Sequence, residues 1–173
     1  MALTLYDAAT GTFRQILAGL SGVLDKGLAH CRENGIEPDE LVETRLFPDM
    51  APFRSQIQSV VHHSKGALDA IKAGEFRPPS TRDTQDYPEL QQLITRTRTA
   101  LDAVTPDEVN AHAASDITFR MGDLAIPFTV QDFLLSFSLP NFYFHATTAY
   151  DILRSKGVTI GKRDYLGPLK IKR

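Results

Sequence analysis

Histidines are the residues of this chain best suited to chemistry, and His145 stands in its most apolar stretch. If that stretch, Thr129–Gly157, is a helix, Asn141 and Thr148 lie on the same side as His145. An imidazole can carry a proton, accept a hydrogen bond or bind a metal ion. Two interpretations follow. His145 is either a buried histidine that hydrogen-bonds to a neighbour, or part of a functional pocket with Asn141 and Thr148.

A second pair of imidazoles, His62 and His63, occurs in the run HHSKGALDAIKAG. In a helical projection His63 lies nearer the apolar stripe, whereas His62 shares a face with Gln58 and Lys65. We therefore expect His63, rather than His62, to face the interior as a candidate pocket residue. The alternative is that His63 is a polar residue at the boundary of the core.

Other catalytic patterns are weak. The run Gly161-Lys162-Arg163 is too short for a phosphate-binding loop, and no nucleophile elbow is present. Cys31 falls in an apolar stripe and is expected to be a small core residue. Aromatic residues follow helical spacing near His145, and they form either plain core or the lining of an apolar pocket; they are Phe133, Phe137, Phe142, Tyr143, Phe144 and Tyr150.

The stretch that carries His145 reads as one long helix. Thr129 can cap its start, with Asp132 in the first turn, and Gly157 marks its end. Pro140 predicts a kink or a restart of the helix at that point. Apolar side chains cover most of the circumference. Such a helix is buried inside a bundle or also meets a second subunit.

The rest of the chain supplies the elements that would surround this helix. Apolar residues at spacings of three and four predict three more long helices, and β-type residues on both sides of Gly122-Asp123 predict a small hairpin. A polar loop is expected over residues 75–85, and the end of the chain is expected to be irregular. We therefore predict an all-α, four-helix bundle with a small β-hairpin before the last helix, in a single domain over residues 1–173. The predicted helices cover residues 4–33, 52–74 and 86–104, and the hairpin covers 117–128.

Composition excludes several classes of function. The net charge of -2 gives no general attraction to nucleic acid or to anionic membranes. The single cysteine cannot form an intramolecular disulfide, and no signal peptide is evident, so we expect a cytoplasmic protein. The last residues are basic, and we interpret them as a solvated end rather than a nucleic-acid site; they are Lys156, Lys162, Arg163, Lys170, Lys172 and Arg173.

Two runs of the sequence resemble a known family. HHSKGALDAIKAG and NFYFHATTAYDILRSKGVTIGKRDYLG are similar to the domain-of-unknown-function family DUF1993, which is grouped with the DinB/YfiT-like bundles. The resemblance extends over essentially the whole chain. It implies a four-helix bundle that is commonly dimeric and sometimes binds a divalent metal such as Zn or Ni. Some relatives are thiol-dependent transferases.

The resemblance also implies where a metal would bind. The DinB-like metal site uses one histidine on the second helix and two on the fourth, one turn apart. His63 matches the first position and His145 one of the others, but the one-turn neighbours of His145 are Asn141 and Ala149. Because a catalytic zinc site normally has three protein ligands, the site is expected to be degenerate unless a carboxylate such as Asp69 or Asp151 completes it.

Two hypotheses of function follow. In the first, the protein is a non-catalytic, dimeric bundle domain that binds a small apolar ligand. The alternative, implied by the resemblance, is a divalent-metal-dependent thiol S-transferase with His63 and His145 as ligands.

Overall fold

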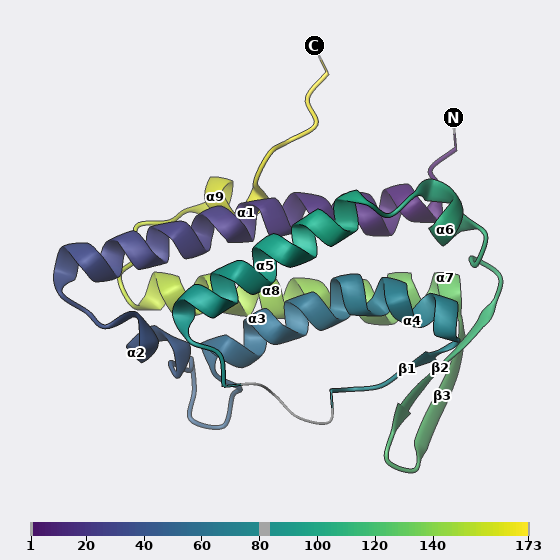
Figure 1. Ribbon diagram of the computed structural model, residues 1–173, viewed down its shortest axis with the longest axis horizontal. Helices are drawn as coiled ribbons and strands as arrows, with labels where there is room; N and C mark the ends of the chain where they lie inside the picture. Colours follow the sequence, from purple (N-terminus) through teal and green to yellow (C-terminus); the bar gives the residue numbers. More distant parts are fainter. Residues whose placement is uncertain (1, 80–83, 173) are drawn as a thin grey trace.

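The computed structural model describes residues 2–79 and 84–172, and this part of the chain is mostly helical with a small three-stranded sheet (Figure 1). Its elements, in chain order, are α1 (Leu5–Asn34), α2 (Pro38–Val42), α3 (Phe53–Val61), the π-helical turn η1 (His62–Gly66), α4 (Ala67–Ala73), β1 (Glu75–Phe76), α5 (Tyr87–Asp102), α6 (Pro106–Asn110), β2 (Asp116–Met121), β3 (Leu124–Thr129), α7 (Val130–Asp132), the π-helical turn η2 (Phe133–Ser138), α8 (Leu139–Ser155) and α9 (Lys162–Leu166).

Helix starts are set by local capping. The side chains of Thr4, Asp86 and Thr105 each accept a hydrogen bond from the backbone N–H three residues on. The acidic side chain at that later position accepts a hydrogen bond from the backbone N–H of the capping residue in return. Thr129 accepts from the N–H of Asp132 at the start of α7. Helix α1 ends at Gly35, whose φ of +66° favours glycine. The boundaries of α1, of the segment from α3 to α4 and of α5 lie within two residues of the predicted ones.

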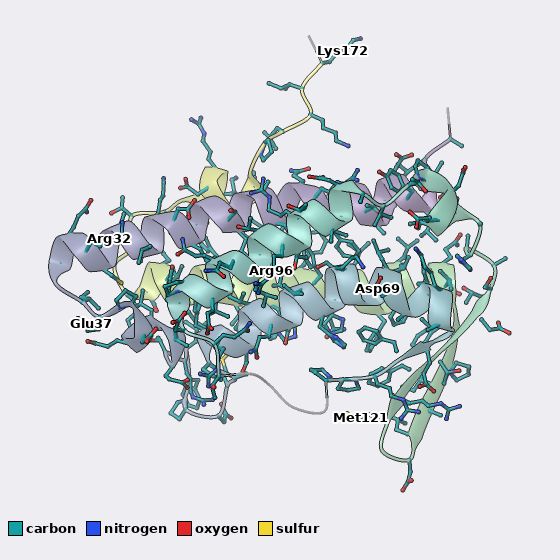
Figure 2. All side chains as sticks on the ribbon, in the orientation of Figure 1. Arg32, Glu37, Asp69, Arg96, Met121 and Lys172 are labelled. Carbon is teal, nitrogen blue, oxygen red and sulfur yellow. The ribbon has the colours of Figure 1, made fainter. Side chains whose placement is uncertain are left out.

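The long helices pack in two layers. Helices α1 and α5 lie side by side above α3, α4 and α8 (Figure 1), and α1 also contacts α8 while α3 contacts α5. Side chains fill the space between the layers (Figure 2). The largest fully buried ones come from α1, α3, α5, η2 and α8 and include Phe13, Phe53, Tyr87, Phe133 and Phe142. No helix in residues 2–79 and 84–172 has both the length and the apolar character needed to cross a membrane.

Two of the helical segments contain a π-helical turn. Helix α3 continues through η1 into α4, and α7 continues through η2 into α8. Pro140 lies in the first turn of α8, directly after η2. Proline has no N–H and its ring clashes with the preceding turn, so the wider turn of η2 makes room for it. The predicted break at Pro140 therefore takes the form of a helix restart.

The sheet is larger than the predicted hairpin. Strands β2 and β3 pair antiparallel, with Ile117 opposite Phe128, and they turn at Gly122, whose φ is +58°. Strand β1 adds to β2 in parallel, with Phe76 opposite Phe119. β1 lies in the segment predicted to be a loop, because two residues are too few to show a strand period. Residues 80–83 of that predicted loop lie outside the described part of the chain.

The last long helix is less enclosed than predicted. Leu135 is 41% exposed, Tyr143 40% and Phe144 57%, so three large apolar side chains of η2 and α8 face solvent. The end of the chain, predicted to be irregular, contains α9, which packs on α1. The last described residues leave the body of the molecule, with Lys172 at the tip (Figure 2).

Candidate functional site

A cavity of about 190 Å³ lies between the second helical segment, the last one and the sheet. Its lining combines imidazole, amide and phenyl groups from α3, η1, β1, β2, η2 and α8. The lining residues are Gln58, Ser59, His62, His63, Phe76, Pro78, Pro79, Phe119, Phe137, Asn141 and His145.

His63 and His145 meet at this cavity. Their rings are nearly parallel, with 5.9 Å between centroids and an interplanar angle of 17°. His63 belongs to η1 and His145 to α8, and they approach because α3 and η1 pack along α8. Asn141 lines the same cavity one turn before His145, and its Nδ2 donates to the carbonyl of Phe137 at 2.8 Å. Three of the four predicted pocket residues thus border one space.

Thr148, the fourth predicted pocket residue, is placed elsewhere. It is buried and does not line the cavity; its hydroxyl donates to the carbonyl of Phe144 at 2.8 Å, one turn earlier in α8. His62, predicted to lie on another face than His63, does line the cavity, and its ring stacks on Phe76 at 4.3 Å between centroids. The projection that separated His62 from His63 assumed a regular α-helix, whereas both residues lie in the wider turn η1.

The two π-helical turns are joined at the site. Ser138, the last residue of η2, donates a hydrogen bond from Oγ to the backbone carbonyl of His63 in η1, at 2.7 Å. Both residues are buried. Turns of this type occur frequently at functional sites, where they redirect side chains. Here the contact connects the backbone under His63 to the start of the helix that carries His145.

A buried glutamine orients the imidazole of His145. Gln56, 2% exposed, donates from Nε2 to the carbonyl of Ala51 at 2.8 Å, and its Oε1 lies 2.7 Å from Nδ1 of His145. No local sequence signal points to Gln56, because it is 89 residues from His145 along the chain. The contact is the main feature of the site that sequence reasoning missed.

Phenyl rings form the apolar part of the lining. Phe119 and Phe137 lie 4.9 Å apart between centroids, and Phe76 lies 6.3 Å from each of them. Phe137 is therefore the member of the predicted aromatic set that reaches the cavity. The others divide between the core (Phe133 and Phe142), the solvent-facing side (Tyr143 and Phe144) and a contact with Tyr165 (Tyr150).

Charged side chains are absent from the described lining of this cavity. Asp69, one of the carboxylates considered for a metal site, forms an ion pair with Lys65, and Asp151 is exposed on α8. In residues 2–79 and 84–172, no three His, Cys, Asp or Glu side chains come close enough together to hold a metal ion. The described residues therefore do not fit the three-ligand site that the resemblance implies.

Two other features are less suited to binding or catalysis, because their polar groups are already paired or buried. A second hollow of about 190 Å³ contains Lys65, Asp69, Lys72 and Glu108, but these charges already form two ion pairs. The hydrogen bond from Lys72 lowers the pKa of Glu108 to about 2. Cys31 is buried in the core, and this burial raises the pKa of its thiol, so it behaves as a packing residue.

This arrangement of helices is shared with a solved structure. The chain is similar to the crystal structure of a DinB family member protein from Shewanella denitrificans, with a TM-score of 0.82 and 29% sequence identity, over 98% of this chain and 95% of that one. The fold is thus of the DinB-like class. The profile of the family described as "Domain of unknown function (DUF1993)" matches residues 5–166, and the chain belongs to that family. A comparison with curated proteins finds no match.

Proposed function

We propose that the protein is a DinB-like four-helix-bundle domain that binds a small, largely apolar molecule in the cavity beside His63 and His145, without catalysis and with a degenerate metal site. The observation that carries this proposal is the lining itself, in which phenyl rings provide apolar surface and imidazole and amide groups provide a few polar contacts. Ligand sites generally have this composition, because apolar surface supplies affinity and a few polar groups fix orientation.

The volume limits the ligand. An engineered protein cavity of about 150 Å³ holds benzene, and the cavity here measures about 190 Å³. A single aromatic ring with one small substituent, or an aliphatic molecule of similar size, therefore fits. Larger cofactors exceed the volume of the described cavity.

Fluorobenzene is a suitable probe because its ¹⁹F resonance reports binding directly. We expect saturable binding to the wild-type protein and at least tenfold weaker binding to Asn141→Phe, whose added ring would occupy the cavity. Asp151→Phe places the same ring on an exposed position of α8 outside the lining, and it should bind the probe like the wild type. Absence of saturable binding to the wild type would reject the proposal.

We further infer that the protein is a homodimer, because η2 and α8 expose several large apolar side chains. They are Leu135, Tyr143 and Phe144, and exposed apolar patches commonly mark protein interfaces. Light scattering should show a dimer at micromolar concentration and a monomer for Phe144→Asp. Leu169→Asp, in the exposed tail, is the matched control and should remain dimeric. A monomeric wild type at high micromolar concentration would contradict the inference.

The metal-dependent S-transferase is the second candidate. Its support is the contact of His145 with Gln56, because metal-binding imidazoles usually donate their other N–H to a protein oxygen. The lack of a third ligand among the described residues weighs against it. Metal analysis of protein purified without chelator, beside His145→Ala, decides between the candidates: stoichiometric metal in the wild type alone would favour the enzyme.

A further inference from the structure

We propose that the ligand of this cavity carries an unbranched alkyl chain, and that this chain leaves the cavity and lies along the apolar face of the β2–β3 hairpin, against Met121 and Leu124. This proposal rests on the proposed binding function and adds the chemical class of the ligand. The residues that carry it belong to the sheet and lie beyond the histidines of the site.

The hairpin has one apolar face, which its register defines. Phe119 pairs with Ile126, and Met121 pairs with Leu124 next to the turn. Because successive side chains of a strand point to opposite faces of the sheet, these four residues share one face. Ala125 stands between Leu124 and Ile126 in β3 and therefore lies on the other face.

This face begins at the cavity and continues beyond it. Phe119 lines the cavity and is 8% exposed, whereas Met121 and Leu124 are 55% and 46% exposed. At the usual rise of about 3.4 Å per residue, Met121 lies about 7 Å further along the strand than Phe119. Pro78 also lines the cavity, and it follows Phe76 by two residues just as Met121 follows Phe119, the parallel partner of Phe76. The described lining therefore reaches along the sheet toward the level of Met121.

Large apolar side chains are unexpected beside a hairpin turn. Turn residues usually face water and are rich in Gly, Asn and Asp, and Gly122-Asp123 fits this pattern. The hairpin projects from the helices (Figure 1), and Met121 lies on its projecting part (Figure 2). Exposed apolar surface that continues from a pocket commonly marks a ligand-binding groove. The Met121–Leu124 pair is therefore a candidate for ligand contact.

The shape of this surface favours a linear chain. The face is only two strands wide, with about 5 Å between the strands, and it leads from the cavity to the turn. The cavity of about 190 Å³ accepts one substituted ring, so a longer substituent has to leave it. Met121 suits such a substituent because its flexible thioether side chain adapts to the shape of its neighbours.

Toluene and butylbenzene, tested by displacement of fluorobenzene, measure the contribution of the chain. A fully buried methylene group adds about fourfold in affinity. A chain on a surface is covered on one side only, so we expect about twofold for each methylene group. Butylbenzene has three more of them than toluene and should bind about eightfold more tightly. If it binds no more tightly, the chain has no site and this inference is wrong while ligand binding stands. If neither compound binds, the proposed function fails and the inference with it.

The double variant Met121→Gln and Leu124→Gln tests where the chain lies. Glutamine keeps the length of the side chains and makes them polar, at two exposed positions. The preference for butylbenzene should fall to about twofold or less, with toluene affinity unchanged. Ala125→Gln, which alters the exposed opposite face beside Leu124, is the matched control and should keep the full preference. A preference that survives in the double variant would overturn the assignment. So would a lower mass of the double variant in light scattering, because it would identify a second copy of the chain as the partner of this face.

Discussion

The hydrogen bond between Ser138 and the backbone of His63 can be tested by deleting one atom. Ser138→Ala removes the Oγ donor, which lies 2.7 Å from the buried carbonyl of His63. Taking a hydrogen bond from a buried polar group costs about 1–3 kcal/mol. For a chain of this length, each kcal/mol lowers the melting temperature by roughly 2–4 °C, so the expected decrease is about 2–12 °C.

Ser136→Ala is the matched control in the same turn. Ser136 is exposed, and its hydroxyl donates to the carbonyl of Asp132. Both variants gain the higher helix propensity of alanine, so the difference between them isolates the buried hydrogen bond. Urea unfolding should place Ser138→Ala about 1–3 kcal/mol below Ser136→Ala, and fluorobenzene affinity should fall only in the former. A difference below about 0.5 kcal/mol, the usual spread of surface substitutions, would refute the role given to this contact.

Three further predictions concern the supporting structure. In Gly19→Ala the new methyl would lie 2.3 Å from the carbonyl oxygen of Tyr165, so α9 should detach from α1. Trypsin should then cleave in α9 at least tenfold faster than in the wild type. Gly22→Ala is the control: it has open space around it and should stabilise the protein by about 0.5–1 kcal/mol. Burial raises the pKa of the Tyr87 phenol well above its usual value, so the unfolded chain loses this proton first and stability falls as pH rises above about 10, by up to about 1.4 kcal/mol per pH unit. Urea unfolding at pH 9 and 11 should show a smaller loss for Tyr87→Phe, and equal losses would contradict this. Burial also raises the pKa of the Cys31 thiol, so a disulfide reagent should modify it no faster than the protein unfolds, and modification within seconds under native conditions would disprove that.

Helix boundaries were predictable because their chemistry is local. A capping box joins a side chain to a backbone amide three residues on, so Thr4, Asp86 and Thr105 mark helix starts in the sequence as clearly as in the structure. The hairpin turn at Gly122 is equally local. Strand β1 has no such signal, because two residues become a strand only when β2 lies beside them.

The site was predictable only in part, for a related reason. Asn141 and His145 could be selected because polar residues in an apolar helix are conspicuous, and His63 because the resemblance to the DinB-like bundles implies a histidine in the second helix. The place of His62 depends on the π-helical turn η1, which a uniform helical projection does not contain. Gln56 reads as an ordinary polar residue of a helix, and its role appears only when α3 lies against α8.

Helix interruptions explain why the cavity lies where it does. In a regular helix an apolar stripe faces the core and polar residues face water, which leaves no place for several imidazoles inside. The turns η1 and η2 break this periodicity at the same level of the bundle, where Ser138 joins them. Polar groups on both segments can then turn inward without disturbing the apolar stripes before and after them. The polar groups of the cavity therefore depend on Pro140 and the wide turn before it, as well as on the histidines themselves.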